Sequence, residues 1–101
     1  MRLLVFFDLP MQTDKDKREY TQFRKFLQMN GFIMMQQSVY SKLVVNNVTS
    51  DLMRHKIKGH IPARGLVQML TITENQFSKI EYLVGQEQQA TLDGLDRLVE
   101  I

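Results

Sequence analysis

The sequence predicts an α+β domain whose strands and helices follow one another in the order βαββαβ. Short apolar runs typical of strands alternate along the chain with two amphipathic segments of helical spacing. The length of 101 residues and the 44% share of hydrophobic residues suffice for one modest core and leave no room for a second domain. We therefore expect one domain over residues 1–85 and a tail over residues 86–101.

The first strand and the first helix have clear signals at their ends. The apolar run 2–8 stops at Leu-Pro and is typical of a buried central strand. Thr13 and Asp16 have the spacing of a capping box with Asp in place of Glu, so a helix should span residues 14–29. Asn30-Gly31 is a typical stop signal for that helix.

The middle of the chain predicts the remaining elements of the domain. Segment 32–45 is apolar with a polar break at Gln36-Gln37, which leaves open two short strands or one sharply bent strand. Helical spacing over residues 48–58, closed by Gly59, predicts a second helix. Alternation over residues 66–73 predicts the last strand. The complete order is that of the ferredoxin-like fold, an antiparallel sheet with two helices on one face.

Two further segments after this fold predict extra C-terminal strands. Residues 80–84 form a short apolar run, and residues 91–101 alternate weakly within an acidic tail. Such strands need a sheet edge, which could be their own or that of a second copy. The second option would make a homodimer obligatory.

Composition and charge limit the compartment of the protein. Cysteine is absent, which excludes disulfides and thiolate zinc sites and fits a reducing compartment. The apolar run at the N-terminus is too short for a signal peptide or a membrane span. We therefore expect a cytoplasmic protein with no membrane partner.

Basic residues gather in two clusters, and nucleic-acid phosphates are their candidate partners. The first cluster lies on the predicted first helix, and the second runs through residues 54–64. Such clusters are also ordinary as solvated faces, and a dimer that joins them into one stripe would favour the binding role. The residues predicted to contact nucleic acid are Lys15, Lys17, Arg18, Arg24, Lys25, Arg54 and Lys58.

Asp8 and Ser38 are the candidate catalytic residues. Asp8 ends the first strand, and two copies meeting across a two-fold axis could hold Mg²⁺ or Mn²⁺ and activate water on a phosphodiester. Ser38 follows the polar pair and could bind a phosphate or orient that water. The structural alternatives are a turn-capping Asp and a hairpin or bulge Ser, and each is the commoner role for its residue type.

Four motifs carry a resemblance over essentially the whole chain. They are Leu-Val-Phe-Phe-Asp-Leu-Pro (4–10), Phe-Arg-Lys-Phe-Leu (23–27), Asn-Gly-Phe-Ile-Met-Met-Gln-Gln-Ser-Val-Tyr (30–40) and Gly-Leu-Val-Gln-Met-Leu-Thr-Ile-Thr (65–73). Together they resemble the second CRISPR-associated protein family, the small subunit of the spacer-acquisition complex. The variant that accompanies type II-A systems is the most similar.

The resemblance implies both a scaffold role and an enzymatic role. The family's ferredoxin-like homodimer bridges two dimers of the integrase subunit and spans the middle of a short DNA duplex, the prespacer. The family is also described as a metal-dependent endonuclease on single-stranded RNA or double-stranded DNA. Asp8 would then be the Mg²⁺ ligand, and Ser38 matches the motif serine. The resemblance also implies that the tail over residues 86–101 packs on the partner protomer or on the integrase subunit. A stand-alone, toxin-like endoribonuclease of the same fold is the alternative.

Overall fold

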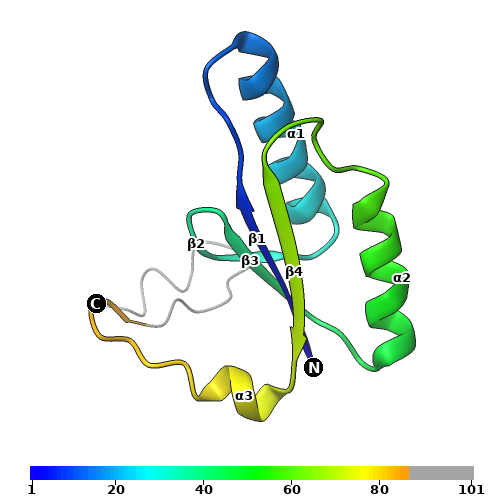
Figure 1. Cartoon of the computed structure of the whole chain (residues 1–101). Helices are drawn as coiled ribbons and strands as arrows, with labels where there is room; N and C mark the ends of the chain where they lie inside the picture. Colours follow the sequence, from blue (N-terminus) through cyan, green and yellow to red (C-terminus); the bar gives the residue numbers. More distant parts are fainter. Residues whose placement is uncertain (87–101) are drawn as a thin grey trace.

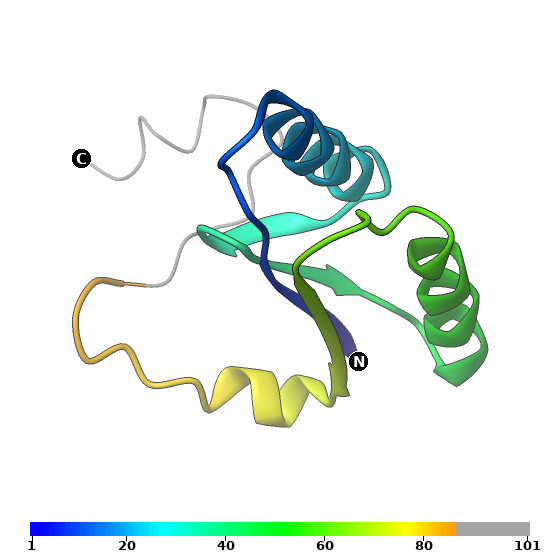
Figure 2. The same cartoon turned by 45° about the horizontal axis from the view of Figure 1, so that its top comes forward.

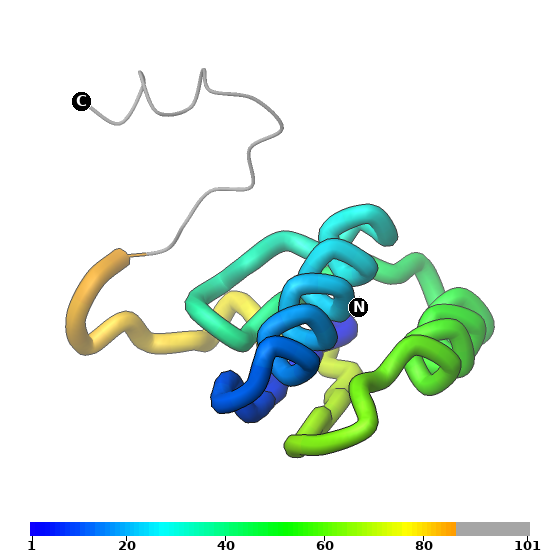
Figure 3. Tube along the Cα trace, turned by 90° about the horizontal axis from the view of Figure 1, so that it is seen from above, coloured from blue at the N-terminus to red at the C-terminus, as the bar shows by residue number. Residues whose placement is uncertain are grey.

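The computed structural model describes residues 1–86, in which a four-stranded antiparallel sheet has the order β2-β3-β1-β4. Helices α1 and α2 lie beside each other over one face of this sheet (Figures 1, 2 and 3). This arrangement confirms the predicted ferredoxin-like class. The elements are β1 (Arg2–Asp8), α1 (Asp14–Met29), β2 (Ile33–Gln36), β3 (Val39–Leu43), α2 (Asn47–Lys58), β4 (Leu66–Ile72) and α3 (Glu74–Ser78).

Both long helices begin where side chains satisfy their first backbone N–H groups. The Thr13 hydroxyl accepts a hydrogen bond from the backbone N–H of Asp16, and the Asp16 carboxylate accepts one from the N–H of Thr13. This confirms the predicted capping box. Asn46 caps α2 by a single backbone hydrogen bond, in which its side-chain oxygen accepts from the N–H of Thr49.

The alternation of β1 divides the molecule into two chemically different faces. Leu3, Val5 and Phe7 are buried beneath the helices and form the centre of the core. The intervening residues Leu4 and Phe6 therefore belong to the opposite face of the sheet, which carries neither long helix. β1 lies between β3 and β4, so the side chains on either side of β1 also mark the two faces of the sheet.

The face opposite α1 and α2 is apolar and, apart from the end where Arg2 contacts α3, open. Leu4 is buried there by its neighbours, but Leu43, Leu66 and Leu70 are 60%, 54% and 49% exposed. Strand pairing places Leu43 beside Arg2, and Leu70 beside Leu4. Exposed leucines gathered on one sheet face are typical of a surface that binds a partner.

The chain after β4 differs from the prediction. A strand was expected over residues 80–84, but the chain forms the short helix α3 and then runs without regular structure to residue 86. Thr73 and Gln76 make a second capping box, which turns the chain into a helix directly after β4. Residues 80–84 then line a cavity with Met35 and Gln36 of the edge strand β2, but they do not pair with that strand. The strand expected over residues 91–101 lies outside the described residues.

Arg2 holds α3 against the sheet. Its Nε atom lies 2.9 Å from Oε2 of Glu74, and its guanidinium lies 4.3 Å from the centre of the Phe77 ring. No helix within residues 1–86 is long and apolar enough to cross a membrane. The boundary expected between residues 85 and 86 stays a prediction.

Candidate metal and nucleic-acid site

Asp8 lies at the end of β1 and is exposed on the open face. It shares this face with Leu4 and Phe6, four and two residues earlier on the strand. Its position is fixed by close packing of the backbone, since a Cβ atom on Gly65 would lie only 2.8 Å from the carbonyl oxygen of Asp8. Its carboxylate makes no hydrogen bond or ion pair with any described residue, so the turn-capping alternative has no support in the observed contacts.

One chain supplies few ligands for a metal ion. Residues 1–86 contain no cluster of three or more His, Cys, Asp or Glu side chains that could hold one. Asp8 alone suits Mg²⁺, because this ion keeps several waters and often binds through one or two carboxylates together with substrate phosphates. The donor set therefore fits a hydrated Mg²⁺ shared with a second copy or a phosphate, and does not fit a closed protein cage.

Ser38 lies in the turn between β2 and β3, next to the end of β1 (Figure 1). Its carbonyl oxygen accepts a hydrogen bond of 3.1 Å from the N–H of Phe7. Its φ of 70° is in the left-handed region, which costs a residue other than glycine about 1 kcal/mol. Of the two open readings of segment 32–45, the structure shows two short strands with a register shift between Met34 and Gln36.

Asp8 and Ser38 are neighbours at one end of the sheet, but they serve different faces. Asp8 belongs to the open face, whereas Ser38 lines a cavity beneath α1 together with Tyr20 and Arg24. The sequence placed both residues at one site without separating the faces. The hydrogen bond from the N–H of Phe7 to the carbonyl oxygen of Ser38 brings the two backbone segments together. The side chains of Asp8 and Ser38 lie on opposite faces and do not meet.

The basic residues of α1 form an exposed surface. Among the described residues, Lys15 makes one long ion pair of 3.9 Å with Glu19. The other four make no ion pair within residues 1–86, and we call them the α1 basic surface: Lys17, Arg18, Arg24 and Lys25.

The second basic cluster is partly used to hold the fold together. Arg54 donates a hydrogen bond of 2.7 Å from Nη2 to the Thr71 hydroxyl, which ties α2 to β4. Arg64 pairs with the buried Asp16 at 3.4 Å. Lys58 is exposed and stays available to a phosphate. The sequence could not show this division, since it depends on which side chains point inward.

Asp16 is a buried carboxylate with several partners. Burial alone would raise its pKa, but hydrogen bonds from Thr13 and the nearby guanidinium of Arg64 outweigh burial and hold the pKa below 3.8. The charged form is therefore favoured, and it joins the start of α1 to the loop between α2 and β4.

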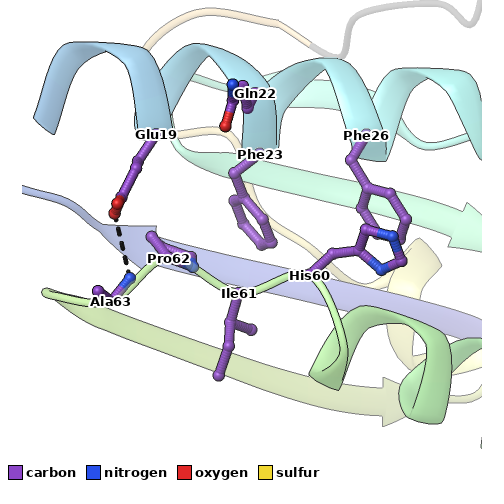
Figure 4. Close-up of a pocket in the computed structure, with 8 residues that line it drawn as sticks. All are labelled: Glu19, Gln22, Phe23, Phe26, His60, Ile61, Pro62 and Ala63. Atoms are coloured by element: carbon purple, nitrogen blue, oxygen red, sulfur yellow. Dashed lines mark hydrogen bonds between the residues drawn. The ribbon is translucent and has the colours of Figure 1, made fainter. Parts of the chain in front are cut away.

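A cavity of about 430 Å³ separates α1 from the same loop (Figure 4). The His60 ring stacks on Phe26 with 4.1 Å between the ring centres, and His60 Nδ1 lies 2.9 Å from the carbonyl oxygen of Lys56. Glu19 lines the cavity and accepts a hydrogen bond from the N–H of Ala63. These groups hold the loop in place, and the carboxylate disfavours an anionic ligand.

Comparison with known proteins identifies the family. A family model described as "CRISPR associated protein Cas2" matches residues 1–80. The chain belongs to the Cas2 family. It is 46% identical over 99 residues to a protein of Treponema denticola, with 98% of both chains covered. It is 41% identical over 99 residues to a protein of Streptococcus mutans, covering 98% of this chain and 91% of that one. Both relatives are named "CRISPR-associated endoribonuclease Cas2".

A solved Cas2 structure shares the fold. The crystal structure of Streptococcus pyogenes Cas2 at pH 6.5 superposes with a TM-score of 0.64 at 18% identity. The match covers 83% of this chain and all of that chain. The resemblance read from the four sequence motifs is thereby confirmed at the level of the family and of the fold.

Proposed function

We propose that this Cas2-family chain is a cytoplasmic, dimeric scaffold that binds duplex prespacer DNA and bridges integrase subunits during CRISPR spacer acquisition. The observation that carries the proposal is the division of the molecule into an apolar open face and a basic helix face. The open face offers Leu43, Leu66 and Leu70 to a second copy, and α1 offers cations to phosphates.

A two-fold dimer through the open face would join the two features. The same residues would meet their own copies across the axis, because a two-fold interface is isologous. Asp8 belongs to this face, so two Asp8 carboxylates would approach each other at one end of the paired sheets. The α1 surfaces lie on the other side of each sheet and would stay outside the interface, so the dimer would present two of them.

The test of the scaffold is the salt dependence of duplex binding. Each phosphate contact contributes about 0.9 to the slope of log affinity against log salt. Replacing all four residues of the α1 basic surface by Gln should weaken binding to a short duplex and reduce the slope by about 3 to 4. Fluorescence anisotropy over a series of salt concentrations measures both effects.

A matched single substitution controls for net charge. Lys25 and Lys79 are both exposed, and Lys79 lies after α3, away from α1. Lys25→Gln should reduce the salt slope by about 1 and Lys79→Gln should leave it unchanged. Equal effects of the two substitutions, or an unchanged slope in the quadruple variant, would refute the role of α1.

A second candidate function is Mg²⁺-dependent phosphodiester hydrolysis, on single-stranded RNA or on duplex DNA. It is favoured by the exposed carboxylate of Asp8, which no described residue neutralises, and by the relatives' names as endoribonucleases. A bound Mg²⁺ would polarise a phosphoryl oxygen and make a bound water more acidic. Asp8 would supply the protein ligand, and Mn²⁺ suits the same oxygen donors.

The test of this second function is the rate at which wild type and Asp8→Asn cleave single-stranded RNA or duplex DNA. Each protein is assayed once with Mg²⁺ and once with a chelator. Loss of cleavage both in the variant and in chelator would support it, whereas cleavage by Asp8→Asn at the wild-type rate would exclude Asp8 as the ligand. Asp8→Asn should keep duplex binding, because Asp8 lies outside the α1 basic surface. Co-purification with an integrase subunit separates the scaffold from a stand-alone, toxin-like ribonuclease, which would need no such partner.

A further inference from the structure

Tyr40 has a buried hydroxyl group without a hydrogen-bond partner. Its side chain is 0% exposed, and the hydroxyl is the buried side-chain polar atom of residues 1–86 for which no partner is found. The ring is held in place by stacking on Phe7, with 5.7 Å between the ring centres. A buried polar group left unpaired is costly to a folded protein, so this hydroxyl needs a partner. The Gln28 side chain is near enough to lower the pKa of the phenol but makes no hydrogen bond of normal geometry, which leaves room for an atom bound in the adjoining cavity.

A cavity of about 320 Å³ adjoins this residue, between α1 and the turn that joins β2 to β3. Nearly all its polar lining groups can donate hydrogen bonds, one is a guanidinium, and no carboxylate lines it. This distinguishes it from the cavity of Figure 4, which contains Glu19. The lining residues are Tyr20, Arg24, Met34, Gln37, Ser38 and Tyr40.

The electrostatics of the cavity also favour an anion. Burial raises the pKa of the Tyr40 phenol, so this group stays protonated and can donate. Arg24 is close enough to oppose that rise. Ser38 reaches the cavity from a left-handed backbone conformation, a strain that proteins keep mainly at functional positions.

We propose that this cavity binds a phosphate group, with the Arg24 guanidinium and the hydroxyls of Tyr40 and Ser38 as donors to its oxygens. A phosphate has several acceptor oxygens and a negative charge, which matches a set of donors around one guanidinium. The group can come from free phosphate or from a nucleic-acid strand. The assignment to a strand rests on the proposed function, whereas the phosphate site itself does not.

Titration of the full-length protein with inorganic phosphate, followed by amide NMR shifts, tests the site. Sodium chloride at equal ionic strength is the reference. Arg24→Gln and Tyr40→Phe should each weaken phosphate binding about tenfold or more, as expected for the loss of a hydrogen bond to a charged group. Lys79→Gln also removes one positive charge, and Tyr82→Phe also removes one phenol hydroxyl, at exposed positions outside the cavity, so both should leave binding unchanged.

Tyr40→Phe should fold normally, because it removes an unpaired hydroxyl and keeps the ring. Its thermal midpoint without phosphate should equal or exceed that of wild type, while the stabilisation by phosphate should shrink. Phosphate shifts that match those of chloride would overturn the proposal. So would equal phosphate affinity in wild type and Tyr40→Phe.

Binding of a short duplex by the wild-type protein, Tyr40→Phe and Tyr82→Phe then shows whether the phosphate belongs to a nucleic-acid strand or is free phosphate. Weaker duplex binding by Tyr40→Phe than by Tyr82→Phe would assign the phosphate to a nucleic-acid strand. Tyr40→Phe could instead weaken the binding of inorganic phosphate and leave duplex binding unchanged. That result would support the site with free phosphate as its ligand. Failure of the scaffold function appears separately, as absence of duplex binding by the wild type.

Discussion

Leu70 provides a direct test of the open sheet face as a dimer interface. It lies on β4 opposite Leu4, and about half of its side chain, 49%, is exposed in the single chain. Complete burial of a leucine side chain contributes about 2 kcal/mol, so covering the exposed half contributes about 1 kcal/mol. A two-fold interface contains the residue twice. Leu70→Ala should therefore cost the dimer about 2 kcal/mol, which raises its dissociation constant about 30-fold.

Sedimentation equilibrium over a range of protein concentrations measures this dissociation constant. Leu52→Ala is the matched control, because Leu52 is 67% exposed but lies on α2, on the helix side of the sheet. The control should leave the dissociation constant unchanged. A shift of less than threefold for Leu70→Ala, or an equal shift for Leu52→Ala, would refute the assignment of the open face to the second copy.

Two further predictions concern the region around the end of β1. The pKa of Asp16 is lowered in the folded protein, so its contribution to the free energy of unfolding is present above 3.8 and is lost as the pH falls through the lower folded value. Urea unfolding between neutral pH and about pH 3 should therefore show a smaller acid loss for Asp16→Asn than for wild type. Gly65→Ala should destabilise the protein by about 1 to 3 kcal/mol more than Gly85→Ala, because both have positive φ but only Gly65 packs against the backbone of Asp8. Equal thermal midpoints of the two alanine variants would contradict this packing.

The sequence predicted the elements whose signals are local. The capping box of Thr13 and Asp16 located the start of α1, and the apolar run 2–8 located β1 with its bounds as observed. The helix α3 was missed although the spacing of Thr73 and Gln76 is also that of a capping box. The alternation of apolar residues in β4 runs directly into Thr73, so the predicted strand over residues 66–73 includes the residue that caps α3.

The strand predicted over residues 80–84 fails for a different reason. Alternation of apolar residues predicts that a segment can form a strand, but a strand forms only where a sheet edge is available to pair with it. Within residues 1–86 neither edge strand, β2 or β4, pairs with this segment. Pairing across the chain is a long-range property, and no local pattern encodes it.

The candidate site shows the same division between local and long-range information. Asp8 could be placed on the sheet from the strand signal alone, and the exposed position of its carboxylate agrees with that placement. The structural use of Arg54 could not be foreseen, because it depends on Thr71, seventeen residues later. The cavity beside Tyr40 was also missed, since its lining comes from α1 and from the hairpin of β2 and β3, which are separated in sequence.

The end of β1 connects the two proposed sites. Phe7 and Asp8 are consecutive, so they project to opposite faces of the sheet. Phe7 supports the Tyr40 ring beside the phosphate cavity, and its N–H holds the turn that contains Ser38. Asp8 faces the surface assigned to the second copy. A nucleic-acid strand that crosses this end of the sheet would therefore meet a donor-lined cavity on one side and a carboxylate on the other. One stretch of backbone fixes both groups, so a displacement of β1, as expected for Gly65→Ala, should weaken the proposed phosphate binding and the proposed cleavage at Asp8 together. Tyr40→Phe should weaken phosphate binding and leave that cleavage unchanged.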